Sequence, residues 1–106
     1  MKKTIFLTIA VLLFVASMAW AVNNQITITN AAAVIYAEPS NTSACRLFKN
    51  TSSSVTIYIA NSPGVSTTTG TPLAPGEHIS KCGKTGSWYA VTASGTAVLS
   101  YIIIFE

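Results

Sequence analysis

The stretch Gln25-Ile26-Thr27-Ile28-Thr29 indicates the fold class, because apolar and polar side chains alternate along it. This period of two is typical of a half-buried β-strand, whose successive side chains point to opposite faces of a sheet. A second stretch, Val55-Thr56-Ile57-Tyr58-Ile59, places three β-branched apolar residues on one face. No segment of residues 22–106 has the apolar spacing of an amphipathic helix. The sequence therefore predicts an all-β protein.

Turn signals divide the remainder into further short strands. We interpret residues 50–54 as a hairpin loop between two strands, and residues 61–76 as one long loop with a Pro-Gly turn signal near each end. The other strands are expected at residues 34–37, 45–49, 55–60, 77–82, 87–92 and 96–105. About six or seven short strands with turns between them predict a single small antiparallel β-sandwich or flattened barrel.

The N-terminal segment predicts export. Two lysines and an apolar run from Ile5 to Ala16 precede small residues at the −3 and −1 positions of a cut after Ala21. These are the parts of a secretory signal peptide, so we expect residues 1–21 to be removed and residues 22–106 to form the β-sandwich domain. The domain would then be periplasmic, secreted or part of an extracellular or virion assembly, with no membrane contact. An uncleaved membrane anchor is the alternative, because the segment approaches the roughly 20 apolar residues of a spanning helix.

Cys45 and Cys82 both lie beyond the expected cut. In an exported chain, an even number of cysteines indicates a disulfide, and we expect these two residues to be joined. Two free buried thiols are the alternative.

The charged residues after the cut exclude one class of partner. They are few and nearly balanced: Arg46, Lys49, Lys81 and Lys84 against Glu38, Glu77 and Glu106. A protein that follows a phosphate backbone needs a basic patch, and none is present. We therefore expect no nucleic-acid partner.

The sequence offers little catalytic chemistry. Beyond the expected cut it has no aspartate and a single histidine, His78, so a catalytic triad would need His78 with a glutamate. Glu77 adjoins His78, and neighbours on a strand point to opposite faces. A zinc site needs three or four ligands, and His78 with Cys82 supplies two. We expect no catalytic residues, no metal, no cofactor and no enzymatic activity.

Aromatic residues could form a platform for a ligand. Trp88, Tyr89, Tyr58 and Tyr101 would admit a carbohydrate by stacking, although nothing else in the sequence supports one. Core packing is the favoured interpretation, because Trp88 and Tyr89 must face opposite sides of one strand.

The order of several short motifs resembles a small β module of tailed-phage virions. That module occurs in head-decoration, head-fibre and tail-associated proteins, and the resemblance covers residues 26–106. The chain departs from the pattern by its signal peptide, its expected disulfide, and Ala60-Asn61 where the module often has glycine. The motifs are Asn50-Thr51-Ser52-Ser53, Ile57-Tyr58-Ile59, Gly64-Val65, Gly70-Thr71-Pro72-Leu73-Ala74-Pro75-Gly76, Trp88-Tyr89-Ala90-Val91 and Ser94-Gly95-Thr96.

The resemblance implies a structural subunit of an assembly, with this chain or another protein as its partner. The alternative is a monomeric secreted binding module, such as an adhesin-like domain or an inhibitor of an extracellular enzyme. Two segments are candidates for contact. One is the hydroxyl-rich part of the long loop, Ser66, Thr67, Thr68, Thr69 and Thr71. The other is the end of the last strand, which is apolar on both faces: Tyr101, Ile102, Ile103, Ile104 and Phe105.

Overall fold

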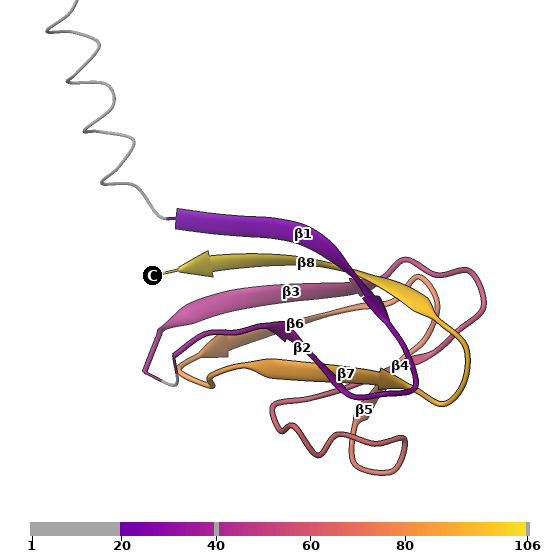
Figure 1. Ribbon diagram of the computed structural model, residues 1–106. Helices are drawn as coiled ribbons and strands as arrows, with labels where there is room; N and C mark the ends of the chain where they lie inside the picture. Colours follow the sequence, from indigo (N-terminus) through magenta and orange to yellow (C-terminus); the bar gives the residue numbers. More distant parts are fainter. Residues whose placement is uncertain (1–19, 40, 106) are drawn as a thin grey trace, which may run out of the picture.

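The computed structural model describes residues 20–39 and 41–105, and this part of the chain contains eight strands and no helix (Figure 1). The strands are β1 (Trp20–Ile28), β2 (Ala33–Tyr36), β3 (Ala44–Asn50), β4 (Ile57–Ala60), β5 (Thr71–Leu73), β6 (His78–Gly83), β7 (Trp88–Thr92) and β8 (Ala97–Phe105).

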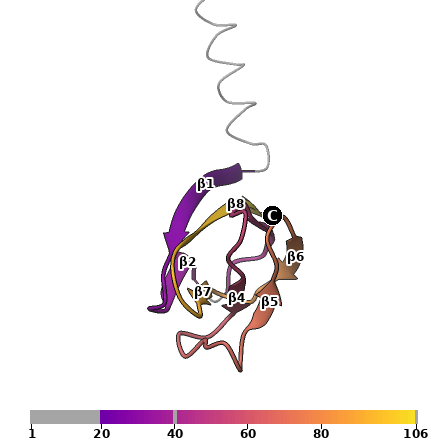
Figure 2. The same cartoon turned by 90° about the vertical axis from the view of Figure 1, so that its right-hand side faces the viewer.

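The strands form two antiparallel four-stranded sheets. Sheet A has the order β1-β8-β3-β6, and sheet B has the order β2-β7-β4-β5. The pairing is nested: β1 pairs with β8, β2 with β7, β3 with β6, and β4 with β5. The chain is therefore one long hairpin, folded at the β4–β5 connection and rolled into two layers (Figure 2). Two four-stranded sheets joined in this way have the topology of a jelly roll, and the predicted all-β sandwich is confirmed.

Two details of the predicted strands are wrong. Residues 50–54 are not a hairpin loop, because β3 belongs to sheet A and β4 to sheet B. Asn50, fully buried, holds this crossing in place: its Nδ2 donates to the carbonyl oxygens of Val55 (2.7 Å) and Leu73 (2.9 Å). Residues 61–76 are not one loop either, because Thr71 begins the short strand β5, which pairs with β4.

The core lies between the two sheets and follows the predicted alternation. Along β8, Ala97, Leu99, Tyr101 and Ile103 are buried, while the residues between them are half-buried or exposed. Ile28 of β1 is fully buried. The ring centroids of Phe48 in β3 and Trp88 in the opposite sheet lie 6.1 Å apart. The period of two read from the sequence therefore determines which side chains form the core.

The N-terminal predictions fall mostly outside the described residues. Residues 1–19 of the predicted signal peptide are not among them, and Trp20 and Ala21 form the start of β1. In the part of the chain that is described, no helix has the length and apolar character needed to cross a membrane.

Candidate interaction surfaces

An apolar patch lies on the outer face of sheet A. Three large hydrophobic side chains are exposed there: Leu47 of β3 (38%), and Ile102 (36%) and Ile104 (44%) of β8. The register places Leu47 directly opposite Ile102, and Cys45 directly opposite Ile104. These residues surround a shallow hollow of about 230 Å³, lined by Cys45, Arg46, Leu47, Ser80, Ile102 and Ile104. We call Leu47, Ile102 and Ile104 the outer-face patch.

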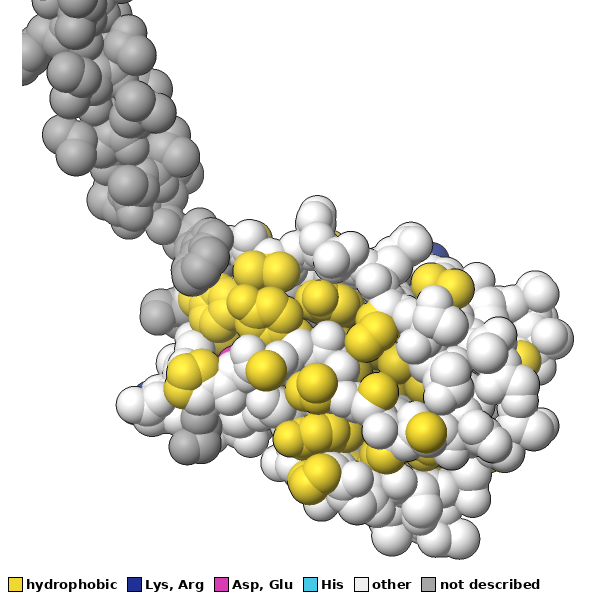
Figure 3. All heavy atoms as spheres, in the orientation of Figure 1, with side chains coloured by type: hydrophobic (Ala, Val, Ile, Leu, Met, Phe, Trp, Pro, Cys, Tyr) yellow, Lys and Arg dark blue, Asp and Glu magenta, His cyan; other side chains and the backbone are white. Residues whose placement is uncertain are grey.

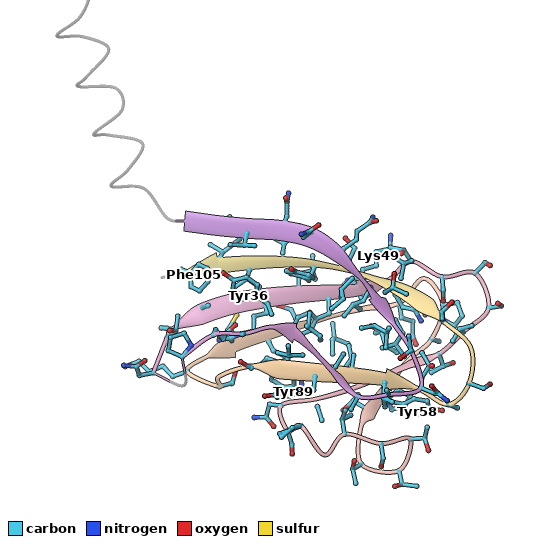
Figure 4. All side chains as sticks on the ribbon, viewed as in Figure 1. Tyr36, Lys49, Tyr58, Tyr89 and Phe105 are labelled. Carbon is cyan, nitrogen blue, oxygen red and sulfur yellow. A yellow bond between two sulfur atoms is a disulfide. The ribbon has the colours of Figure 1, made fainter. Side chains whose placement is uncertain are left out.

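The structure divides the predicted contact residues of β8 between two faces. Tyr101 and Ile103 point into the core, and Phe105 is partly buried against it, with its ring 6.3 Å from that of Tyr36 (Figure 4). Ile102 and Ile104 point outward. β8 lies centrally between β1 and β3, so its edges are paired, but none of the described strands covers its outer face.

Leu47 belongs to this surface but was not among the predicted contact residues. The signal was present, since Leu47 and Phe48 are adjacent apolar residues on a strand and must face opposite sides. Phe48 is the one that points into the core.

The predicted disulfide between Cys45 and Cys82 is confirmed. It joins directly opposed residues of β3 and β6, with 4.0 Å between the Cα atoms. The bridge lies on the same face as the outer-face patch, because Cys45 alternates with the buried residues Ala44 and Arg46. Cys82 is exposed on β6, at one edge of the sheet.

The segment between β4 and β5, residues 61–70, has a defined shape. Val65 is buried and the Gly70 amide donates to the Ser66 carbonyl oxygen at 2.8 Å. The Ser66 hydroxyl lies 2.9 Å from that of Thr68 and 3.0 Å from that of Thr69. Of the predicted contact residues, Thr67, Thr68 and Thr69 are exposed here, Ser66 is half-buried, and Thr71 lies in β5. Their predicted role in binding stays a prediction.

The titratable side chains considered for a catalytic triad or a zinc site do not come together at one place in the described structure. Glu38 is paired with Arg46, and the Glu77 carboxylate accepts a hydrogen bond from the Ala74 amide at 2.7 Å. His78 is exposed at the start of β6. Among the described residues, no group of three or more His, Cys, Asp or Glu side chains is placed to hold a metal ion.

The four aromatic residues proposed as a platform are divided between two sites. Trp88 packs on Phe48 inside the sandwich and donates from Nε1 to the Thr85 hydroxyl at 2.8 Å. Tyr101 is buried in the core. Tyr58 and Tyr89 are half-buried on the outer face of sheet B (Figure 4). Tyr58 lies between the buried residues Ile57 and Ile59, and Tyr89 precedes the buried Ala90. Trp88 and Tyr89 thus face opposite sides of β7, as predicted.

A second apolar zone follows the open side of the sandwich, between β1 and β2. Figure 3 shows apolar side chains gathered in a band between these two strands. The partly buried residues that pack against the core from this side are Val22 and Ile26 of β1, Tyr36 of β2 and Phe105 of β8.

No family model matches the chain, and no curated protein matches it. A solved structure described as "Bacillus endospore appendages form a novel family of disulfide-linked pili" aligns with 85% of this chain and 91% of its own, at 22% identity and a TM-score of 0.46. A likeness at this level does not assign a function.

Proposed function

We propose that this protein is an exported, non-enzymatic structural subunit that assembles with further copies of itself through the outer-face patch of sheet A. The observation that carries the proposal is the exposure of Leu47, Ile102 and Ile104 side by side on a pleated surface that no described strand covers. A cluster of large apolar side chains in contact with water usually marks an interface.

The chemistry of the patch is compatible with a second copy of the chain. In a symmetric contact, a charged group that lies near the two-fold axis meets the same charge of the other copy. Among the described residues that line the hollow at the patch, the one charged residue is Arg46, and its side chain lies on the opposite, buried side of β3, paired with Glu38. Lys49 is exposed on the same face of β3, two residues from Leu47, so two copies avoid charge repulsion when the contact is confined to the patch and leaves Lys49 at its rim. The resemblance of the sequence to virion modules suggests a finer form, a decoration or fibre subunit of the tailed-phage type.

The test is the molar mass of the purified protein in light scattering, at concentrations up to the high micromolar range. Ile102→Lys and Ile104→Lys are expected to lower the molar mass of the assembly, because each places an ammonium group in the apolar contact. Val34→Lys is the matched control, since Val34 has nearly the same exposure (37%) but lies in sheet B. A wild-type protein that stays monomeric, or an assembly that both isoleucine variants leave intact, would overturn the proposal.

A second candidate, a monomeric binding module, is favoured by the shape of residues 61–70. Hydrogen bonds within the segment and the buried Val65 hold exposed threonine hydroxyls in fixed positions. A preorganised loop on a rigid scaffold is a common site of recognition. A wild-type monomer in the scattering experiment would favour this candidate over the assembly subunit.

A further inference from the structure

We propose that the free edge of β1 pairs with β1 of a second copy, antiparallel and centred on Asn24, so that two copies of sheet A form one continuous eight-stranded sheet. This contact uses the edge of sheet A and is distinct from the outer-face patch. It does not depend on the proposed function, although both contacts would act in the same assembly.

β1 differs from the other three sheet edges. Natural edge strands are protected against pairing by lysine, proline, irregular register or short length. β6 carries Lys81, β5 is three residues long and contains Pro72, and β2 is four residues long with a register shift between Val34 and Tyr36. β1 is nine residues long, with an unbroken register against β8, no charged residue and no proline. It has one strand neighbour in the described part of the chain, and Figure 1 shows it at the margin of the sheet.

The backbone of β1 presents hydrogen-bonding groups at this edge. The Gln25 amide donates to the side-chain Oδ1 of Asn24 at 2.8 Å, so it points away from β8. In an antiparallel strand, the amide and carbonyl groups of alternate residues point to the same side. The backbone groups of Asn23 and Thr27 therefore share the free edge with those of Gln25. All three residues are exposed, and a neighbouring strand would find donors and acceptors in regular order once the Asn24 side chain releases the Gln25 amide.

The side chains of β1 match themselves when the pair is centred on Asn24. Val22 then lies opposite Ile26 of the second copy, on the face that continues the core. Asn23 lies opposite Gln25 on the outer face, and the two Asn24 amides meet at the two-fold axis. A shift of the centre to residue 23 or 25 would instead set Val22 or Ile26 opposite Asn24. Apolar cross-strand pairs stabilise a sheet, and an apolar residue facing an amide loses that contribution.

The alternative occupant of the edge is β6 of a second copy, which would give an open chain of subunits. β6 of a second copy could also run antiparallel to β1. However, β6 carries Lys81, whose Nζ lies 5.9 Å from the ring centroid of Trp88. Pairing with β1 would bring this lysine against an uncharged strand and disturb its ring contact. Self-pairing of β1 involves no charged side chain, and we therefore favour it.

Cysteine cross-linking tests both the contact and its register. Residues directly opposite in an antiparallel pair have Cβ atoms about 4.5–5.5 Å apart, and diagonal neighbours about 7–8 Å. A disulfide needs about 3.5–4.5 Å, which slight adjustment reaches only for direct opposites. Asn24→Cys in the full chain should therefore give a covalent dimer under mild oxidation. Asn23→Cys, whose copies would be diagonal, is the matched control and should give about ten-fold less. Peptide mapping verifies that Cys45 and Cys82 remain joined.

Three results would overturn the proposal: no dimer from Asn24→Cys, equal dimer from both variants, or a ladder of oligomers when Asn24→Cys is combined with Lys81→Cys. Adding Gln25→Pro to Asn24→Cys should abolish the dimer, because proline removes the central amide donor at the edge. Adding Ile102→Lys instead should leave the dimer yield unchanged. The edge contact and the outer-face contact can therefore fail separately.

Discussion

Arg46 and Glu38 form an ion pair inside the protein, with side chains that are 0% and 1% exposed. Arg46 Nε donates to both carboxylate oxygens of Glu38, at 3.0 and 3.1 Å. Its Nη1 donates to the carbonyl oxygens of Ala44 (3.0 Å) and Gly83 (3.1 Å). One side chain thus ties the segment after β2 to β3 and to the end of β6.

We predict that Glu38→Gln lowers the free energy of unfolding by about 3–5 kcal/mol, because it leaves the buried guanidinium without its counter-charge. The double variant Glu38→Leu/Arg46→Met should lose less than Glu38→Gln, since both buried charges are then removed. Urea denaturation measures both. Glu77→Gln, at an exposed carboxylate, is the control. If Glu38→Gln and the wild type have equal free energies of unfolding, the ion pair makes no net contribution to stability.

Gly70→Ala is predicted to destabilise the fold by about 1–3 kcal/mol, through overpacking. A Cβ atom at residue 70 would lie 2.8 Å from Cβ of Tyr58 and 3.0 Å from the Ser66 carbonyl oxygen. Gly64→Ala, in the same segment, is the matched control, because its nearest neighbour would be the Ser62 hydroxyl at 3.8 Å. Thermal unfolding should separate the two variants. Similar melting temperatures would mean that residues 61–70 shift to make room for the added methyl group and are not held against sheet B.

Removal of the disulfide, as Cys45→Ser/Cys82→Ser, is predicted to cost about 3–4 kcal/mol, because the bridge closes a loop of 37 residues in the unfolded chain. Cys82 is exposed on an edge strand, so a thiol reductant should reach the bridge without unfolding the protein. Intact mass after alkylation should show no labelled thiols before reduction and two afterwards. Labelling of both cysteines without reductant would contradict the pairing.

The sequence predicts individual strands of this fold well. In β1 and β8 the alternation of Ile26 and Ile28, or of Leu99 and Tyr101, follows directly from the two-residue period of a strand. The disulfide follows from cysteine count and expected export. The outer-face patch was partly predictable, because Ile102 and Ile104 cannot enter the core together with Tyr101 and Ile103.

The assignment of strands to sheets was not predictable from local pattern. Residues 50–54 resemble a hairpin loop, yet the buried amide of Asn50 directs the chain into the opposite sheet through contacts with Val55 and Leu73. β5 has three residues, one of them proline, so it carries no periodic signal and depends on pairing with β4. The ion pair of Arg46 and Glu38 also depends on segments brought together only by the fold.

The central place of β8 in sheet A determines when the protein can fold. β1 is the first described strand and β8 the last, and β1 has β8 as its strand partner. Until residues 97–105 have left the ribosome or a translocation pore, sheet A lacks the strand that joins β1 to β3. Strands that are far apart in the sequence pair late in folding. In a chain delivered N-terminus first, sheet A therefore stays incomplete until its last described strand has emerged.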